Sequence, residues 1–188
     1  NPEDELKPHH EMPFSRELYI EREDFMEDPP NKFFRMGPGR NVRLKGAYIL
    51  HCENFIKAED GEIIEIHCSY YPESKSGQDT SGIKAKGTLH WVSIQHAATV
   101  KVNQYDRLFT EEFPDKHQDI DFTEFYNKKS LKILDNVKVE PFLLQAEKDQ
   151  SFQFMRKGYF CLDRVQNSDQ LIFNRTVSLK DQWVKKKK

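Results

Sequence analysis

Two histidine–cysteine pairs are the residues whose types first suggest chemistry, because imidazole and thiolate groups are the usual ligands of zinc. The pairs are His51-Cys52 and His67-Cys68. Both lie in alternating apolar stretches that predict strands, and adjacent residues of a strand point to opposite faces of a sheet. Each pair therefore offers at most one ligand to a given site, and the pattern favours structural roles for all four side chains.

Other catalytic signatures are missing from the sequence. It contains no G-x-S-x-G or H-E-x-x-H motif, and Gly37-Pro-Gly39 is too short for a phosphate loop and predicts a turn. The three cysteines are widely spaced and odd in number, which argues against a disulfide framework and favours a reduced, cytosolic setting. No pair of acids stands out, so a β-barrel hydrolase is disfavoured. We expect no catalysis, metal or cofactor in this chain.

Recognition of a ligand is the remaining possibility, and one short stretch illustrates how it would work. Val42 and Leu44 alternate with Arg43 and Lys45, so the apolar pair is predicted to face a core and the cations to face outward. Outward guanidinium, ammonium and amide groups are what hydrogen-bond the phosphates and base edges of single-stranded RNA. The alternative is an ordinary solvated sheet face.

The elements that would position these groups are predicted to be short strands. Alternation with period two recurs along the chain, at Ile64/Ile66, Val100/Val102 and Phe152/Phe154. Asp60-Gly61 between two apolar runs predicts a hairpin, and Glu73 to Ser81 predicts a mobile loop. A short helix is predicted only over Asp119 to Tyr126. The fold class is therefore all-β, as barrels or a sandwich.

Composition sets further limits. The 188 residues suffice for one large or two small domains. A net charge of −2 is not that of a general nucleic-acid binder, so any RNA-binding charge must be local. No run approaches the roughly 18 apolar residues of a membrane span. The start at Asn1 is neither methionine nor signal-like and is interpreted as an internal cut, and Lys185 to Lys188 as a solvated tail.

Several strings resemble the C-terminal anticodon-binding region of class I glutaminyl-tRNA synthetases, in that family's order and spacing. The strongest is Lys86-Gly-Thr-Leu-His-Trp-Val-Ser-Ile-Gln-His-Ala97 with Val100 to Phe109. The others are Asn41 to Leu50, Ser151 to Asp163 and Phe173 to Val177. The resemblance implies two tandem antiparallel β-barrels, a distal one over residues 21–103 and a proximal one over residues 1–20 and 104–188.

The resemblance also implies partners. The parent enzyme would join glutamine to its tRNA with ATP and magnesium, on a catalytic domain whose HIGH-type and KMSKS-type motifs are absent here. This chain would bind the anticodon stem-loop of tRNA(Gln) beside its own catalytic domain, in a cytoplasmic monomer without membrane contact. Two alternatives stay open, namely the same region of an archaeal- or eukaryotic-type glutamyl-tRNA synthetase and a ribosomal 5S RNA-binding β-barrel protein.

Carried over by position, the resemblance assigns anticodon contacts in the first half of the chain. Arg35 matches an arginine that reads the third base, and Lys32 aligns with a nearby glutamine position. Arg43 and Lys45 match two arginines, and because lysine lacks the planar fork, Lys45 is expected to bind phosphate. Phe33 and Phe34 could stack on a base, although core packing is favoured.

Further contacts are assigned in the second half. Gln153 aligns with the glutamine that hydrogen-bonds the central base, since an amide offers both a donor and an acceptor. Arg156 matches the next arginine, and Met155 replaces a frequent glutamate. Because strict alternation would turn Arg156 inward, we expect the strand to end or bulge near Met155. Lys180 and Gln182 occupy positions near the anticodon loop.

Overall fold

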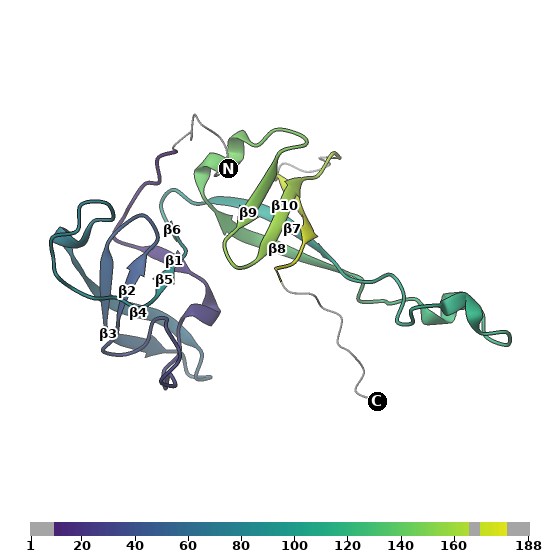
Figure 1. Cartoon of the computed structure of the whole chain (residues 1–188), viewed down its shortest axis with the longest axis horizontal. Coiled ribbons are helices and arrows are strands. Elements are labelled where there is room, and N and C mark those ends of the chain that lie inside the picture. The colour runs from purple at the N-terminus through teal and green to yellow at the C-terminus, as the bar shows by residue number, and fades with distance from the viewer. Residues whose placement is uncertain (1–9, 166–169, 180–188) are drawn as a thin grey trace. The chain divides into compact units, whose positions relative to one another are not determined.

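The chain forms two compact units rich in β-structure. The computed structural model describes residues 10–165 and 170–179. One unit comprises Phe14–Gln95, and the other combines the residues up to Pro13 with those from His96 onward (Figure 1). We call them the N-terminal unit and the C-terminal unit. The barrel boundaries expected at residues 20/21 and 103/104 stay a prediction.

The N-terminal unit contains a four-stranded sheet of order β4-β3-β2-β5 and a two-stranded sheet that pairs β1 with β6. Its strands are β1 (Leu18–Ile20), β2 (Asn41–Leu44), β3 (Ile49–Lys57), β4 (Ile63–Tyr71), β5 (Thr88–Leu89) and β6 (Trp91–Ser93). Val42 and Leu44 are buried, whereas Arg43 is partly exposed and Lys45 exposed. The predicted alternation along β2 is confirmed.

The hairpin predicted at Asp60-Gly61 joins β3 to β4. The two strands are antiparallel partners over nearly their whole length. The turn is closed by a hydrogen bond from the Glu62 N–H to Asp60 Oδ1 at 2.9 Å, and Gly61 has a φ of +84°. Residues with a side chain rarely adopt that φ, so glycine is required for this turn.

The C-terminal unit is built on a five-stranded sheet of order β8-β7-β11-β10-β9. Its strands are β7 (Ala98–Tyr105), β8 (Leu131–Val139), β9 (Ser151–Phe154), β10 (Gly158–Leu162) and β11 (Ile172–Val177). The core of this unit includes Val100, Val102, Phe160 and Phe173. Because these residues alternate with less buried ones along β7, β10 and β11, the core lies on one face of the sheet.

The all-β prediction is confirmed, and the expected closed antiparallel barrels need two corrections. Among the described residues, the hydrogen-bonded ladders end at β8 and β9 in one sheet and at β4 and β5 in the other. The four-stranded and the five-stranded sheet also contain one parallel pair each, β2 with β5 and β7 with β11. These partners are far apart in the chain, so no hairpin forces them to run in opposite directions.

Helical structure is limited to short 3₁₀ segments in the described part of the chain. They are η1 (Arg22–Asp24), η2 (Pro72–Ser74), η3 (Pro114–Lys116), η4 (Phe122–Phe125) and η5 (Pro141–Gln145). The helix predicted over Asp119 to Tyr126 is reduced to η4, whose first residues are capped by the Asp121 carboxylate. No helix among the described residues has the length and apolar character to cross a membrane.

Phe173 is the residue whose truncation should most clearly destabilise the C-terminal unit. Its side chain is 0% exposed, and its ring centroid lies 5.9 Å from that of Phe152 and 6.0 Å from that of Phe154. Phe173→Ala is expected to lower the free energy of unfolding by about 3–5 kcal/mol, through lost burial and a residual cavity. Urea denaturation of the variant measures this loss. Tyr159→Ala, at a 41% exposed position of the same sheet, should cost far less, and equal losses would contradict this account of the core.

Candidate nucleic-acid interface

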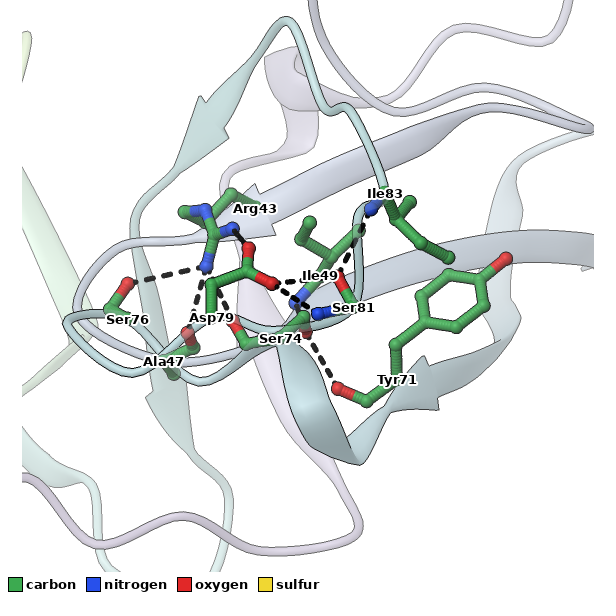
Figure 2. A network of polar contacts seen from close by, with 9 residues as sticks. All are labelled: Arg43, Ala47, Ile49, Tyr71, Ser74, Ser76, Asp79, Ser81 and Ile83. Atoms are coloured by element: carbon green, nitrogen blue, oxygen red, sulfur yellow. Dashed lines mark hydrogen bonds and ion pairs between the residues drawn. The ribbon is translucent and has the colours of Figure 1, made fainter.

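Arg43, an expected RNA contact, is engaged within the N-terminal unit. Its guanidinium donates hydrogen bonds to the Ser74 carbonyl oxygen at 2.6 Å and to Asp79 Oδ2 at 2.5 Å. Longer contacts reach the Ala47 carbonyl oxygen and Ser76 Oγ, both at 3.4 Å. Figure 2 shows the guanidinium of Arg43 with these four partners. Arg43 therefore holds together the stretch that the sequence predicts as a mobile loop.

Two serines and a carboxylate complete this network (Figure 2). The buried Ser74 hydroxyl donates to the Tyr71 carbonyl oxygen at 2.6 Å and accepts from the Ile49 N–H at 2.7 Å. Asp79 Oδ1 accepts from the N–H and the hydroxyl of Ser81, at 2.9 and 2.7 Å. These bonds from Ser81, followed by the Arg43 contact, hold the pKa of the Asp79 carboxyl below its usual value. An ionised carboxylate thus orders the segment.

Lys45 has a fixed backbone and an accessible charge. Its N–H donates to the Leu89 carbonyl oxygen at 2.9 Å, and its own carbonyl oxygen accepts from Trp91 Nε1 at 3.0 Å. The residue is exposed, and among the described residues its ammonium group has no hydrogen-bond or ion-pair partner. A positioned, unneutralised ammonium group suits contact with a phosphate.

Arg40 holds the irregular loop that carries Lys32. Its guanidinium donates to the Phe33 carbonyl oxygen at 2.5 Å and to the Pro29 carbonyl oxygen at 2.9 Å. A turn hydrogen bond joins the Phe33 N–H to the Pro30 carbonyl oxygen at 2.9 Å. The loop lacks regular secondary structure, so these bonds replace the missing ladder. Lys32 is exposed at its tip.

Arg35 is oriented by a buried acid. Its Nη1 donates to the carboxylate of Asp24, whose side chain is 0% exposed while that of Arg35 is 30% exposed. An unpaired buried carboxylate would be costly, so the ion pair fixes both partners. The other guanidinium nitrogens of Arg35 make no hydrogen bond or ion pair among the described residues. They present a planar donor edge of the kind that recognises a base.

An exposed aromatic ring with a lysine over it precedes Arg35 in the chain, and sequence reasoning did not select that lysine. Core packing was favoured for Phe33 and Phe34, and for Phe34 this is wrong, because that side chain is 52% exposed. Lys86 Nζ lies 6.0 Å from the centroid of the Phe34 ring. Gly87 lets its segment approach the Phe34 backbone, since a Cβ atom at position 87 would lie 1.9 Å from the Phe34 carbonyl oxygen. The sequence contains the dipeptide Lys86-Gly87, but it gives no sign that this dipeptide packs against Phe34.

Gln153 lies on the exposed face of the C-terminal sheet. It is exposed, while its neighbours Phe152 and Phe154 are partly buried, as the alternation predicts. Its amide makes no hydrogen bond among the described residues. The residue opposite it on β10 is Tyr159, which is 41% exposed and which sequence reasoning did not select. An available amide beside an exposed ring is a plausible arrangement for holding a base.

Arg156 occupies the three-residue loop between β9 and β10. Strand β9 ends at Phe154, which confirms the predicted end near Met155. Arg156 has a φ of +63°, in the left-handed region, and the Lys157 N–H donates to the Phe154 carbonyl oxygen at 2.9 Å. A positive φ at the third residue of a turn that is closed by an i to i+3 hydrogen bond is typical of a type II β-turn. The turn therefore redirects Arg156 away from strict alternation.

The predicted contacts thus form separate groups. Lys32 and Arg35 share one loop of the N-terminal unit, and Arg43 and Lys45 belong to β2 and the residue after it. Gln153 and Arg156 share one hairpin of the C-terminal unit. Lys180 and Gln182 lie outside the described residues, so their assignment stays a prediction.

The histidine–cysteine pairs are arranged as strand geometry requires. Cys52 and Cys68 are opposite each other across β3 and β4. His51 lies with its Nδ1 2.7 Å from Asn41 Oδ1. Cys68 is exposed as a residue, but desolvation of its thiol, with a contribution from Cys52, raises the pKa of that thiol to about 12. Within the described ranges, no three or more histidine, cysteine or acidic side chains are grouped to hold a metal ion.

Fold and site together define a class. An all-β protein with arginine, lysine and amide groups on loops and strand faces is typical of modules that recognise single-stranded RNA. Two family profiles match the chain, over residues 1–71 and 88–163, and both describe the anticodon-binding domain of class I tRNA synthetases for glutamate and glutamine (E and Q). The chain belongs to this family of anticodon-binding domains.

Curated relatives agree with that assignment. The chain is 49% identical to a glutamine–tRNA ligase of Rhodopirellula baltica over 98% of its own length and 31% of the relative. It is 43% identical to the glutamine–tRNA ligases of Clostridium kluyveri and Nitrobacter hamburgensis, over 97% and 98% of this chain and 33% and 32% of those proteins. The chain therefore spans about a third of the length of these relatives.

The Asp79 network predicts a pH-dependent loop. Because the pKa of Asp79 is lowered in the folded chain, its contribution to order is present above the usual aspartate pKa of about 4 and is lost as pH falls through the lower folded value. Hydrogen exchange at the Ser81 N–H is expected to accelerate in Asp79→Ala at neutral pH. As a control, Asp60→Ala, which removes a similar turn bond elsewhere in the unit, should leave Ser81 protected. Unchanged exchange in Asp79→Ala would remove the proposed role of this carboxylate.

Proposed function

We propose that this chain is the anticodon-binding part of a glutaminyl-tRNA synthetase and that it binds the anticodon loop of tRNA(Gln). The observation that carries the proposal is the match of nearly the whole chain to glutamine–tRNA ligases, with two anticodon-binding profiles along it. The exposed polar groups of both units supply the chemistry that such a loop requires. Bases of an anticodon loop are unstacked at modest cost and are then read at their edges.

The contacts divide by chemistry. Gln153 supports the central base, because its unengaged amide complements the polar edge of uracil. Arg35 reads the third base with the donor edge that Asp24 leaves available. Lys45 binds phosphate and fixes the register. Lys32 and Arg156 contribute further contacts, and Lys180 and Gln182 complete the set.

Arg43 is proposed to act differently from the other cations. Its guanidinium is hydrogen-bonded to Ser74 and Asp79, so direct base reading would require loss of those bonds. We assign it mainly to holding the segment of residues 74–79 beside β2. Any contact with RNA would then come from the part of the guanidinium that remains exposed, since its side chain is 23% exposed.

The reaction belongs to the parent protein. The relatives extend well beyond the matched region, and we place the catalytic domain there, with ATP and magnesium for joining glutamine to tRNA. The fragment itself is proposed to be non-catalytic. A cytoplasmic, monomeric parent fits this role.

The glutamyl alternative is weaker than the glutaminyl one. The family description covers both amino acids, but the three relatives reported above are glutamine–tRNA ligases. A ribosomal 5S RNA-binding protein with a single barrel would leave one of the two units unexplained. Neither alternative is favoured by an observation of its own.

Titration with anticodon stem-loops tests the division of roles. Arg35→Ala and Gln153→Ala are each expected to cost about 1–3 kcal/mol with the cognate loop and much less with loops altered at the third or the central base, respectively. Lys45→Ala should weaken all loops similarly and reduce the slope of log affinity against log salt by about one. Fluorescence anisotropy at two salt concentrations measures both effects.

The control for these variants is Lys57→Ala, which removes an exposed lysine of the N-terminal unit already paired with Glu27 at 2.6 Å. It should change neither specificity nor the salt slope appreciably. Equal losses for every anticodon in the Arg35 and Gln153 variants would reject base reading and reduce both residues to general contacts. Failure of the wild-type chain to bind any stem-loop would reject anticodon binding by this chain alone.

A further inference from the structure

We propose that the Phe34 ring is a stacking platform for an unpaired nucleobase of the bound RNA, with the Lys86 ammonium group beside the ring. The inference rests on the proposed function and deepens it, because the exposure of Phe34 favours base stacking over the core packing expected from the sequence. It starts from the Phe34 side chain, which is 52% exposed and therefore does not belong to the core of the N-terminal unit.

The backbone that carries the exposed Phe34 ring is fixed by two neighbouring segments. Arg40 binds the carbonyl oxygen of Phe33 at 2.5 Å, and Gly87 packs directly against the Phe34 carbonyl group. Gly87 is in turn fixed to the sheet, because its carbonyl oxygen accepts from the Arg43 N–H at 2.9 Å. The Phe34 backbone therefore does not have to be ordered when a ligand binds. Little conformational entropy is lost on stacking.

The charge around the ring suits a nucleic acid. Lys84 and Lys86 are both exposed and alternate with the less exposed Ile83 and Ala85, so they project from one side of their extended segment. Lys86 Nζ is 6.0 Å from the ring centroid, at the outer limit of a cation–π contact. Such a weak contact leaves the ammonium group able to turn to a phosphate when a base covers the ring.

Stacking and base reading would be done by neighbouring residues. An aromatic ring accepts any base, because every base has a π face, whereas hydrogen bonds to base edges discriminate. Arg35 follows Phe34 in the chain and is fixed by Asp24. The ring would hold a base in place while the guanidinium beside it reads an edge.

An apolar protein partner is the competing occupant of an exposed ring. Lysines are depleted at the cores of protein interfaces, and an exposed phenylalanine with the Lys86 ammonium group over its ring fits a phosphate-bearing chain better. Phe113 provides a matched comparison. It is 49% exposed with Lys116 Nζ 3.6 Å from its centroid, but acidic residues surround it in the sequence, at Glu111, Glu112 and Asp115.

Binding of the wild-type chain and four variants to anticodon stem-loops tests the platform. Phe34→Ala is expected to weaken cognate and altered loops alike by about tenfold or more, the usual worth of one base–aromatic stack. Phe34→Tyr should restore most of the affinity and Phe34→Leu should not, because only the former keeps the ring. Phe113→Ala should bind like the wild type. Circular dichroism verifies that the variants are folded.

Photocross-linking gives a second readout that does not depend on a variant. Stem-loops with 5-iodouridine at single loop positions are irradiated with the wild-type chain, and the linked peptide is mapped. A cross-link at Phe34 is the expected result. Unchanged affinity in Phe34→Ala, wild-type affinity in Phe34→Leu, or no cross-link at Phe34 from any loop position would each overturn the platform while leaving anticodon binding intact. Absence of binding by the wild-type chain would overturn both.

Discussion

A strand can bury only every second side chain, and both units depend on this constraint. Along β2, Val42 and Leu44 enter the core, so Arg43 and the following Lys45 are left on the other side. Along β9, Phe152 and Phe154 pack inward and Gln153 is exposed. The residues that stabilise the sheets thereby determine which polar groups a ligand can reach. Recognition is added to the fold without any change to its core.

Arginine and lysine divide the polar work in the N-terminal unit. Arg40 and Arg43 bind backbone carbonyl groups of neighbouring loops, and Arg35 neutralises the buried Asp24. A planar guanidinium can satisfy several acceptors at once, which an ammonium group does less well. The lysines at positions 32, 45, 84 and 86 are instead exposed. Arginines therefore order the loops, whereas lysines supply the accessible ammonium groups. Charge alone predicts the role of the lysines but not that of the arginines.

The sequence predicts correctly those features that depend on residues close together in the chain. The Asp60-Gly61 hairpin and the alternation of β2 and β9 follow from neighbouring residues. The parallel pairing of β7 with β11 does not, because it joins segments that are far apart in the sequence. The same holds for the site. Arg43 is engaged by Asp79, and the Phe34 backbone packs closely against Gly87. Residue types and family positions identified candidates, but partners distant in sequence decided which of them are available.

A chain with 31 acidic and 29 basic residues can still bind RNA, because salt limits the reach of each exposed charge to about 8–10 Å. What matters is the charge within that distance of a contact, and Lys86 lies within it of the proposed contact at Phe34. The acidic stretch of residues 111–124 belongs to the C-terminal unit. The chain also passes between the units twice, after Pro13 and after Gln95. If both units contact one RNA, as proposed, the second contact is intramolecular, so two modest sites can act with the affinity of a much stronger one. Few cations are then needed on either unit, and weak bulk charge limits non-specific binding elsewhere on the surface.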